Sequence, residues 1–202
     1  MSLWLAAHPL VLASKSSVRR ALLESAGIPI EIAPADIDER AIEARAGFEN
    51  AETVAELLAR EKAKAVASVH RNRLVLGADQ TLALGERRFS KASSRAEARQ
   101  QLSALRGRTH TLHSAIAVVQ SGVVVFEYVE TASLTMRSFS YGFLETYLDT
   151  VGDAAMASVG GYQIEGPGIQ LFEKIEGEHS TILGLPLMPL LDWLRRAGHL
   201  TK

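Results

Sequence analysis

Seven charged side chains lie near the expected ends of strands and helices, where they could act together on an anion. The cations could pair with phosphate oxygens, and the carboxylates could bind a hard divalent cation or take a proton from an attacking water. Phosphoryl chemistry needs both functions, because charge must be neutralised and a nucleophile must be oriented. The seven side chains are those of Arg19, Arg20, Glu39, Lys62, Asp79, Lys91 and Glu165.

The first of these candidate sites is the segment from Leu12 to Arg20. The apolar run 9–12 predicts a buried strand, and the pattern over 18–24 predicts a helix whose natural N-cap is Ser16 or Ser17. A helix N-terminus presents free N–H groups and the positive end of a dipole, so this turn and its arginines could bind phosphate. An ordinary strand–cap–helix unit with solvated arginines is the alternative, and these residues alone leave both open.

Two further predicted strands lead into carboxylates. The alternating run 28–33 predicts a strand that is followed by a loop with an acidic cluster, which is either solvated or a metal or base site. The apolar run Leu74–Ala78 predicts a central strand that ends at Asp79–Gln80. Open α/β sheets place their chemistry where such strands end. The acidic cluster comprises Asp36, Asp38 and Glu39.

The rest of the chain alternates between helical and strand patterns, which predicts an α/β fold. His110 and His113 are three residues apart in a β-rich run, so they would face opposite sides, and no zinc pattern is present. The further elements expected are a helix over 53–69, a strand over 81–84, a helix over 96–105, a hairpin of 109–119 and 123–136 around Ser121–Gly122, a helix over 141–150, a glycine-rich loop over 160–168, a strand over 169–175 and a last helix from Pro186.

Composition excludes several classes of protein. The 202 residues suit one domain, with room for a subsidiary lobe, and 47% hydrophobic residues allow a sizeable core. Lys plus Arg number 22 and Asp plus Glu 23, a formal net charge of -1, so no basic excess favours nucleic acid. The chain has no cysteine, which excludes disulfides and thiolate metal sites. It lacks the pattern of a membrane span or a signal peptide, so we expect a soluble cytoplasmic protein with no membrane partner.

Eight segments, taken in order along the chain, resemble the motifs of the Maf family of nucleoside triphosphate pyrophosphatases. The opening family motif Leu-Ala-Ser-x-Ser-Pro-x-Arg-x-x-Leu-Leu corresponds to Leu12 to Leu23. Each motif is weak alone, and the order of all eight is what makes the resemblance specific. The other seven are Asp38–Glu39, Lys62–Ala63, Gly77–Ala78–Asp79, Lys91, Leu105 to His110, Gly161 to Gly168 and Gly184–Leu185–Pro186.

The resemblance implies a fold, a reaction and a cofactor. The fold would be α/β, with a mixed twisted sheet, flanking helices and a central cleft, similar to inosine triphosphatase. Residues 1–202 would form a single domain with two lobes around that cleft. The reaction would be hydrolysis between the α- and β-phosphates of a nucleotide, with a divalent cation, Mg²⁺ or Mn²⁺, and the protein would be a homodimer.

The resemblance also implies roles for individual residues. Asp79 would be the general base or a carboxylate that positions the metal, and Glu39 would help to hold the metal. The triphosphate would be held by Ser14, Arg19 and Lys91, with Lys62 nearby. Catalytic residues are thus expected to be Asp79, Lys91 and Glu39, while Arg20 is expected to be a solvated neighbour.

Three positions bear on the choice of base. Gln80 and Glu165 are similar to the family branch that acts on 7-methyl-GTP, whereas the branch that acts on dTTP and UTP commonly has threonine and glutamine there. Val18 departs from both branches, since the first commonly has tryptophan and the second often has arginine. A carboxylate accepts the N1–H and N2–H₂ donors of guanine but would repel the oxygens of uracil and thymine. We therefore expect a guanine-like substrate.

Other departures concern loop stiffness more than charge. Ser17 and Ala92 stand where the family usually has proline, and Ser90 stands where it usually has glycine. Two alternatives stay open at this stage. One is a broad or pyrimidine-directed pyrophosphatase of the same family, and the other is a non-catalytic regulator of cell division that keeps the fold.

Overall fold

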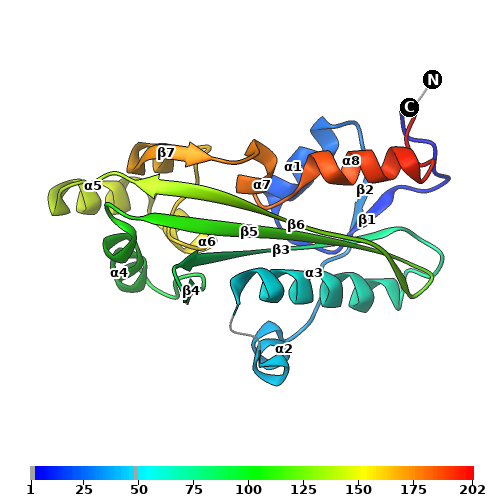
Figure 1. Cartoon of the computed structure of the whole chain (residues 1–202), viewed down its shortest axis with the longest axis horizontal. Coiled ribbons are helices and arrows are strands. Elements are labelled where there is room, and N and C mark those ends of the chain that lie inside the picture. Colours follow the sequence, from blue (N-terminus) through cyan, green and yellow to red (C-terminus); the bar gives the residue numbers. More distant parts are fainter. Residues whose placement is uncertain (1–2, 48–49) are drawn as a thin grey trace. The chain divides into compact units, whose positions relative to one another are not determined.

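The computed structural model describes residues 3–47 and 50–202. Its seven strands form one mixed sheet in the order β2-β1-β3-β5-β6-β7, and β4 pairs with β3 (Figure 1). Strand β1 is parallel to β2 and β3, whereas the β3–β4 and β6–β7 pairs are antiparallel. This confirms the predicted α/β class. The strands are β1 Leu10–Leu12, β2 Ile30–Ile32, β3 Val75–Leu84, β4 Arg87–Phe89, β5 Thr109–Gln120, β6 Val123–Met136 and β7 Phe172–Glu176.

Several of the helices begin at polar capping residues that the sequence makes recognisable. Ser16 caps α1 by accepting from the backbone N–H of Arg19, and Asp38 caps α2 by accepting from Ala41. The helices are α1 Ser17–Ser25, α2 Glu39–Ala46, α3 Ala51–Ala67, α4 Arg95–Leu105, α5 Tyr141–Val151, α6 Ala154–Ala157, the 3₁₀ helix η1 Pro167–Leu171, α7 His179–Ile182 and α8 Leu187–Arg196. None of the helices within the described ranges is long and apolar enough to cross a membrane.

The chain divides into two compact units. The first unit comprises Met1–Gln80, His113–Glu130 and Glu178–Lys202, and the second comprises Thr81–Leu112 and Thr131–Gly177. Strands β3, β5 and β6 contribute residues to both.

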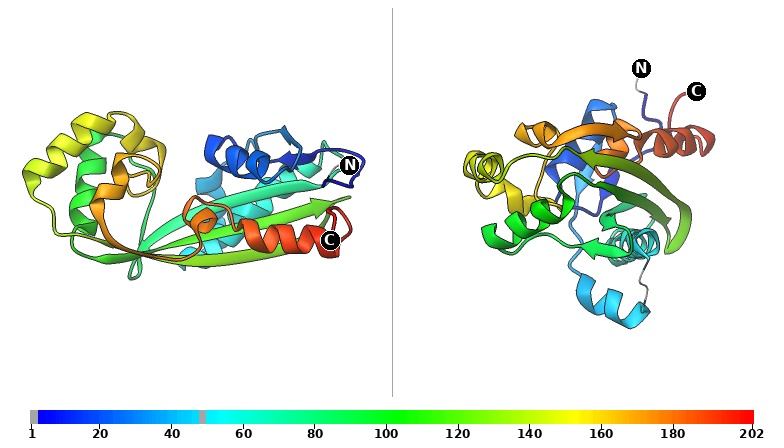
Figure 2. Two further views of the ribbon diagram at one scale, coloured as in Figure 1. Left: turned by 90° about the horizontal axis from the view of Figure 1, so that it is seen from above. Right: turned by 60° about the vertical axis from the view of Figure 1, so that its left-hand side comes forward.

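The first unit buries both faces of its part of the sheet. Helix α3 lies on one face, while α1 and α8 lie on the other (Figures 1 and 2). Val11, Val75 and Ala117 belong to the cluster on the α3 side, and Leu12, Leu76 and Val118 to the cluster on the α1 and α8 side. Neighbouring residues alternate between the two faces because successive side chains of a β-strand point to opposite sides of the sheet. Because both faces are covered there, β1 and the start of β3 are apolar and buried, whereas β2 and the start of β6 also carry exposed and charged residues.

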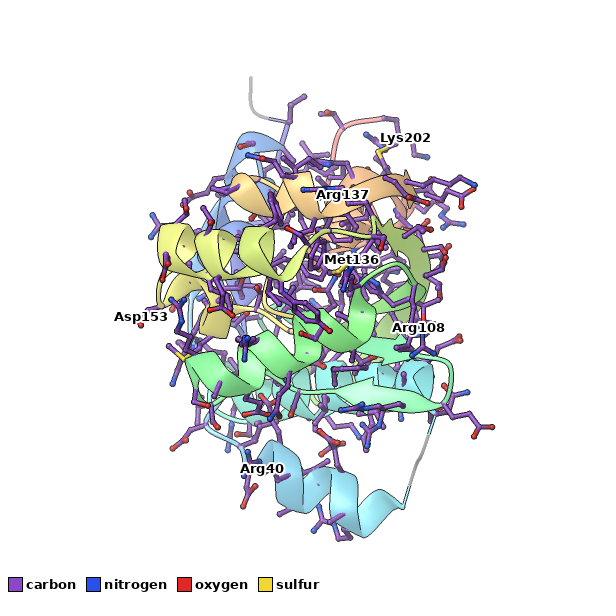
Figure 3. The ribbon with its side chains drawn as sticks, turned by 90° about the vertical axis from the view of Figure 1, so that its left-hand side faces the viewer. Arg40, Arg108, Met136, Arg137, Asp153 and Lys202 are labelled. Carbon is purple, nitrogen blue, oxygen red and sulfur yellow. The ribbon has the colours of Figure 1, made fainter. Side chains whose placement is uncertain are left out.

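The second unit is built around aromatic side chains. The rings of His110, Tyr162 and Phe172 contact one another: the His110 centroid lies 5.7 Å from Tyr162 and 6.0 Å from Phe172, and the latter two are 4.8 Å apart. Helix α4 contacts both α5 and α6. At the end of β6, Arg137 (labelled in Figure 3) lies over the ring of Phe143, with its guanidinium carbon 4.2 Å from the ring centroid.

Three predicted elements differ from the structure. The runs 74–78 and 81–84 are one strand, β3, so Asp79 lies in the middle of a strand and not at its end. The sequence pattern predicts a break there because two polar residues, the charged Asp79 and the neutral Gln80, interrupt the apolar run. Glu39 does not lie in a loop but is the first residue of α2. The strand expected from Ile169 begins at Phe172, because the end of the glycine-rich loop turns into η1 with Pro167 at its start.

Candidate active site

The guanidinium of Arg19 is held by neutral acceptors of the first unit. Its Nε donates to the carbonyl of Gly184 at 2.8 Å, and its Nη1 donates to the carbonyl of Ala78 at 2.8 Å and to Ser14 Oγ at 3.3 Å. The backbone N–H of Arg19 is taken by the cap, Ser16. The side chain therefore turns back from the first turn of α1 toward the end of β1 and the middle of β3, where Ser14 is also buried.

A second cluster joins two carboxylates through one ammonium group. Lys62 Nζ lies 2.5 Å from Asp79 Oδ1 and 2.8 Å from Glu39 Oε1. The Lys62 and Asp79 side chains are 12% and 11% exposed, whereas that of Glu39 is 48% exposed. The site thus runs from a buried carboxylate to a solvent-facing one, with a cation between them.

Burial shifts the pKa of the two innermost groups in opposite directions. It raises the pKa of the Asp79 carboxyl, although Lys62 and Arg19 act to lower it. It lowers the pKa of the Arg19 guanidinium, although Asp79 and Glu39 act to raise it. A carboxyl whose pKa is raised, and which is held in place by a fixed cation, is suited to accept a proton from water.

Strand β3 places these groups because its residues alternate between two faces. Gly77 and Asp79 face α3, and a Cβ on Gly77 would stand 2.1 Å from the carbonyl oxygen of Ala59. Glycine at this position lets α3 approach the strand closely enough for Lys62 to reach Asp79. On the opposite face, Ala78 belongs to the cluster packed by α1 and α8.

Gln80 points to that opposite face and is bonded within the first unit. Its Nε2 lies 2.9 Å from Ser114 Oγ, 3.2 Å from the Thr181 carbonyl and 3.0 Å from the Ile182 carbonyl. Ser114 Oγ also donates to the Thr181 carbonyl at 2.7 Å. These contacts tie β3 and β5 to α7.

The structure thus brings five of the predicted residues together in the first unit. Val18 is half-buried in the first turn of α1, and the exposed Arg20 pairs with Glu24 at 2.9 Å, as a solvated neighbour would. Lys91 and Glu165 are exposed residues of the second unit, and their roles stay predictions. The five residues brought together are Ser14, Arg19, Glu39, Lys62 and Asp79.

Sequence reasoning missed the part played by α7 and the turn that follows it. Gly184 supplies the carbonyl for Arg19 and has a φ of 92°, a backbone conformation that favours glycine. The Gly-Leu-Pro motif predicted a family match and the start of the last helix, but not the contact of the Gly184 carbonyl with Arg19. Ser114 gave no signal, because its function depends on strand register.

Within residues 3–47 and 50–202, no group of three or more His, Asp or Glu side chains is arranged around one point as a protein metal cage would be. The carboxylates of Asp79 and Glu39 nevertheless meet at one cation, the Lys62 ammonium. Two oxygen donors of this kind fit Mg²⁺ or Mn²⁺, since Mg²⁺ commonly takes one or two carboxylates and completes its shell with waters and substrate phosphates.

Residues 9–197 match the family described as Maf-like protein. The chain belongs to the Maf family. A "Nucleoside triphosphate pyrophosphatase" of Rhodopseudomonas palustris (strain BisB5) is 56% identical over 201 residues, which cover 100% of both chains. A "7-methyl-GTP pyrophosphatase" of Rhizobium etli is 50% identical over 192 residues, covering 94% of this chain and 96% of that one.

Among solved structures, the chain is similar to the crystal structure of a nucleoside-triphosphatase, dITP/XTP pyrophosphatase, from Mycobacterium abscessus. That likeness has a TM-score of 0.43 and 18% identity, and covers 93% of this chain and 100% of that one.

Proposed function

We propose that this Maf protein is a nucleoside triphosphate pyrophosphatase that hydrolyses the α–β phosphate bond of a guanine-like nucleotide such as 7-methyl-GTP. The products are the nucleoside monophosphate and pyrophosphate. The observation that carries the proposal is the pairing of a buried Asp79–Lys62 ion pair with a fixed guanidinium, that of Arg19, in one unit. Its relatives named as nucleoside triphosphate pyrophosphatases support the same reaction.

The residues divide the chemistry between proton transfer and charge. A water oxygen bonds to phosphorus and the α–β anhydride P–O bond breaks, so that pyrophosphate leaves. Asp79 takes the proton of that water, which suits its raised pKa. Arg19, Ser14 and Lys62 offer N–H and O–H groups to the phosphate oxygens. Lys91, an exposed residue of the second unit, is proposed to add a further cation.

A divalent cation would be held by Asp79 and Glu39. When bound it would neutralise phosphate charge and polarise the anhydride, which is the chemistry that the Maf family generally obtains from a metal. The two carboxylates are oriented for this by their shared contact with Lys62. The exposed Glu39 side chain leaves the outer end of the site open to hydrated ions.

The preference for guanine is proposed from Glu165 and supported by the relative named for 7-methyl-GTP. Glu165 is exposed, so its carboxylate is accessible to a base edge with two donors. Val18 lacks the aromatic face that a methylated, positively charged guanine favours, so the proposal does not require the methyl group. Gln80 differs from these two residues, because its amide nitrogen is already bonded to Ser114 and to backbone carbonyls.

A panel of nucleoside triphosphates with Mg²⁺ or Mn²⁺ tests the proposal by the release of pyrophosphate. We expect GTP or 7-methyl-GTP to be the fastest substrate, with one monophosphate formed for each pyrophosphate. Faster turnover of UTP or dTTP would favour a pyrimidine-directed enzyme, and no turnover of any nucleotide would favour a non-catalytic regulator. The homodimer and the cytoplasmic location implied by the family resemblance stay proposals, and light scattering tests the first.

A further inference from the structure

The amide of Gln80 has a fixed orientation because all the groups around its nitrogen are acceptors. The Thr181 and Ile182 carbonyls can only accept, and Ser114 Oγ accepts from Gln80 because its own proton is donated to the Thr181 carbonyl. Both N–H groups of the amide are therefore used within the first unit. The opposite end, Oε1, lies 3.5 Å from where a Cβ on Gly184 would stand.

The segment that Gln80 holds is also tied down at other points. The Thr181 side chain is fully buried, and its hydroxyl donates to Glu130 Oε2 at 2.5 Å. Its backbone N–H donates to Glu178 Oε2 at 3.0 Å, which caps α7. Helix α7 is only four residues long, so its position depends on such side-chain contacts more than on its own hydrogen bonds.

What this segment presents to the site is one carbonyl. Gly184 lies two residues after Ile182, the second carbonyl that Gln80 holds, and the Gly184 oxygen accepts from Arg19 Nε at 2.8 Å. The same region is close-packed, since a Cβ on Gly184 would meet Arg19 Nη2 at 3.4 Å. The guanidinium donates hydrogen bonds to the neutral oxygens of Gly184, Ala78 and Ser14, so its direction depends on where those acceptors lie.

We infer that Gln80 is a positioning residue: its amide nitrogen fixes the carbonyls of α7, and through Gly184 it sets the direction in which Arg19 meets the phosphates. This inference rests on the proposed function for the identity of the ligand. A positioning role differs from a role in reading the base. If Gln80 positions Arg19, loss of its amide weakens the binding of every triphosphate alike, including inorganic tripolyphosphate, which has no base.

The test compares Gln80→Met, which keeps the length of the side chain but removes both N–H groups, with Trp4→Phe. The control removes one indole N–H that donates to the His8 carbonyl at 3.0 Å in the same unit. In protein labelled with ¹⁵N-arginine, the Arg19 Nε–H signal is assigned by its absence from Arg19→Lys. We expect this proton to exchange with water about tenfold faster in Gln80→Met, because the net loss of about one hydrogen bond changes an equilibrium by about that factor. In Trp4→Phe we expect the exchange rate to be unchanged.

Binding of inorganic tripolyphosphate with Mg²⁺ gives the second readout. We expect its dissociation constant to rise about tenfold in Gln80→Met, and kcat/KM to fall by a similar factor for GTP, 7-methyl-GTP and UTP alike. Ser114→Ala, which removes an acceptor of the same amide, is expected to change both readouts in the same direction by a smaller factor, and it serves if Gln80→Met does not fold.

Unchanged exchange at Arg19 would overturn the inference, as would a Gln80→Met variant that loses only guanine nucleotides and still binds tripolyphosphate normally. Failure of the proposed function has a different signature. In that case the wild-type protein releases no pyrophosphate from any nucleotide, while the exchange measurement at Arg19 still decides the role of Gln80.

Discussion

Replacing Lys62 tests the arrangement of the site most directly, because the change in the free energy of unfolding reports whether its ammonium neutralises the buried Asp79. Its ammonium contacts the Asp79 and Glu39 carboxylates, and the Asp79 side chain is only 11% exposed. Lys62→Met keeps the aliphatic stem and leaves a buried carboxylate without its cation. Breaking a buried pair in this way costs about 3 kcal/mol, which in a chain of this size lowers the melting temperature by about 6–12 °C.

Lys64→Met is the matched control. It lies on the same helix, α3, and pairs with Glu61 at 3.2 Å, but its side chain is 45% exposed, so its loss costs about 0.5 kcal/mol or less. Both variants and the wild-type protein are unfolded thermally and by urea at pH 7 in the presence of a chelator, so that no divalent cation replaces the ammonium.

Two further measurements assign the cost to the carboxylate. The double variant Lys62→Met/Asp79→Asn lacks the buried charge as well, so we expect it to be at least about 1 kcal/mol more stable than Lys62→Met alone. Burial already raises the pKa of Asp79, so the deficit of Lys62→Met is expected to shrink as the pH falls and the carboxyl takes a proton. A Lys62→Met protein as stable as Lys64→Met would refute the reasoning.

Four other perturbations have expected outcomes. Asp79→Asn is expected to abolish pyrophosphate release while near-UV circular dichroism stays unchanged; undiminished release would remove Asp79 from the mechanism. Glu165→Gln is expected to lower kcat/KM about tenfold or more for guanine nucleotides but not for UTP, and an equal loss for all bases would show that it does not read the base. Burial lowers the pKa of His110 from 6.5 to about 4, so the folded protein disfavours the protonated ring. The stability that this gives is complete above pH 6.5, and up to about 3 kcal/mol is lost as the pH falls from 6.5 to 4. Urea unfolding should show a smaller loss over this range in His110→Gln, and an equal dependence of the free energy of unfolding on pH in both proteins would contradict this. Gly77→Ala places a Cβ 2.1 Å from the Ala59 carbonyl oxygen and is expected to cost about 2 kcal/mol or more in urea unfolding, whereas a neutral effect would show that α3 can move away.

Local signals in the sequence predicted much of the first unit. Ser16 caps α1 as expected, and the Ser121–Gly122 turn joins β5 and β6, with φ values of 51° and 79° at its two residues. Such features depend on a few neighbouring residues, so they can be read without knowledge of the fold. The family motifs likewise placed Arg19 and Asp79 among the candidates before any contact was known.

Contacts between distant segments could not be predicted. Asp79 was expected at the end of a strand, but the strand continues because α3 covers one face and the pair Asp79–Lys62 is satisfied there. The carbonyl of Gly184 meets Arg19 across 165 positions of sequence, and no local pattern encodes that distance. Gln80 is the clearest example of a contact that the sequence does not reveal. An amide side chain could hydrogen-bond the edge of a nucleotide base, and only the register of β3 shows that this amide points to the carbonyls of α7.

The central claim is hydrolysis of a guanine-like nucleoside triphosphate at the α–β bond, and one assay tests it most directly. Wild-type protein is incubated with GTP, 7-methyl-GTP, UTP and dTTP and Mg²⁺ or Mn²⁺, and monophosphate, pyrophosphate and inorganic phosphate are quantified together. We expect monophosphate and pyrophosphate in equal amounts, with a guanine nucleotide turned over fastest. Release of inorganic phosphate with a diphosphate product, or fastest turnover of UTP or dTTP, would contradict the claim.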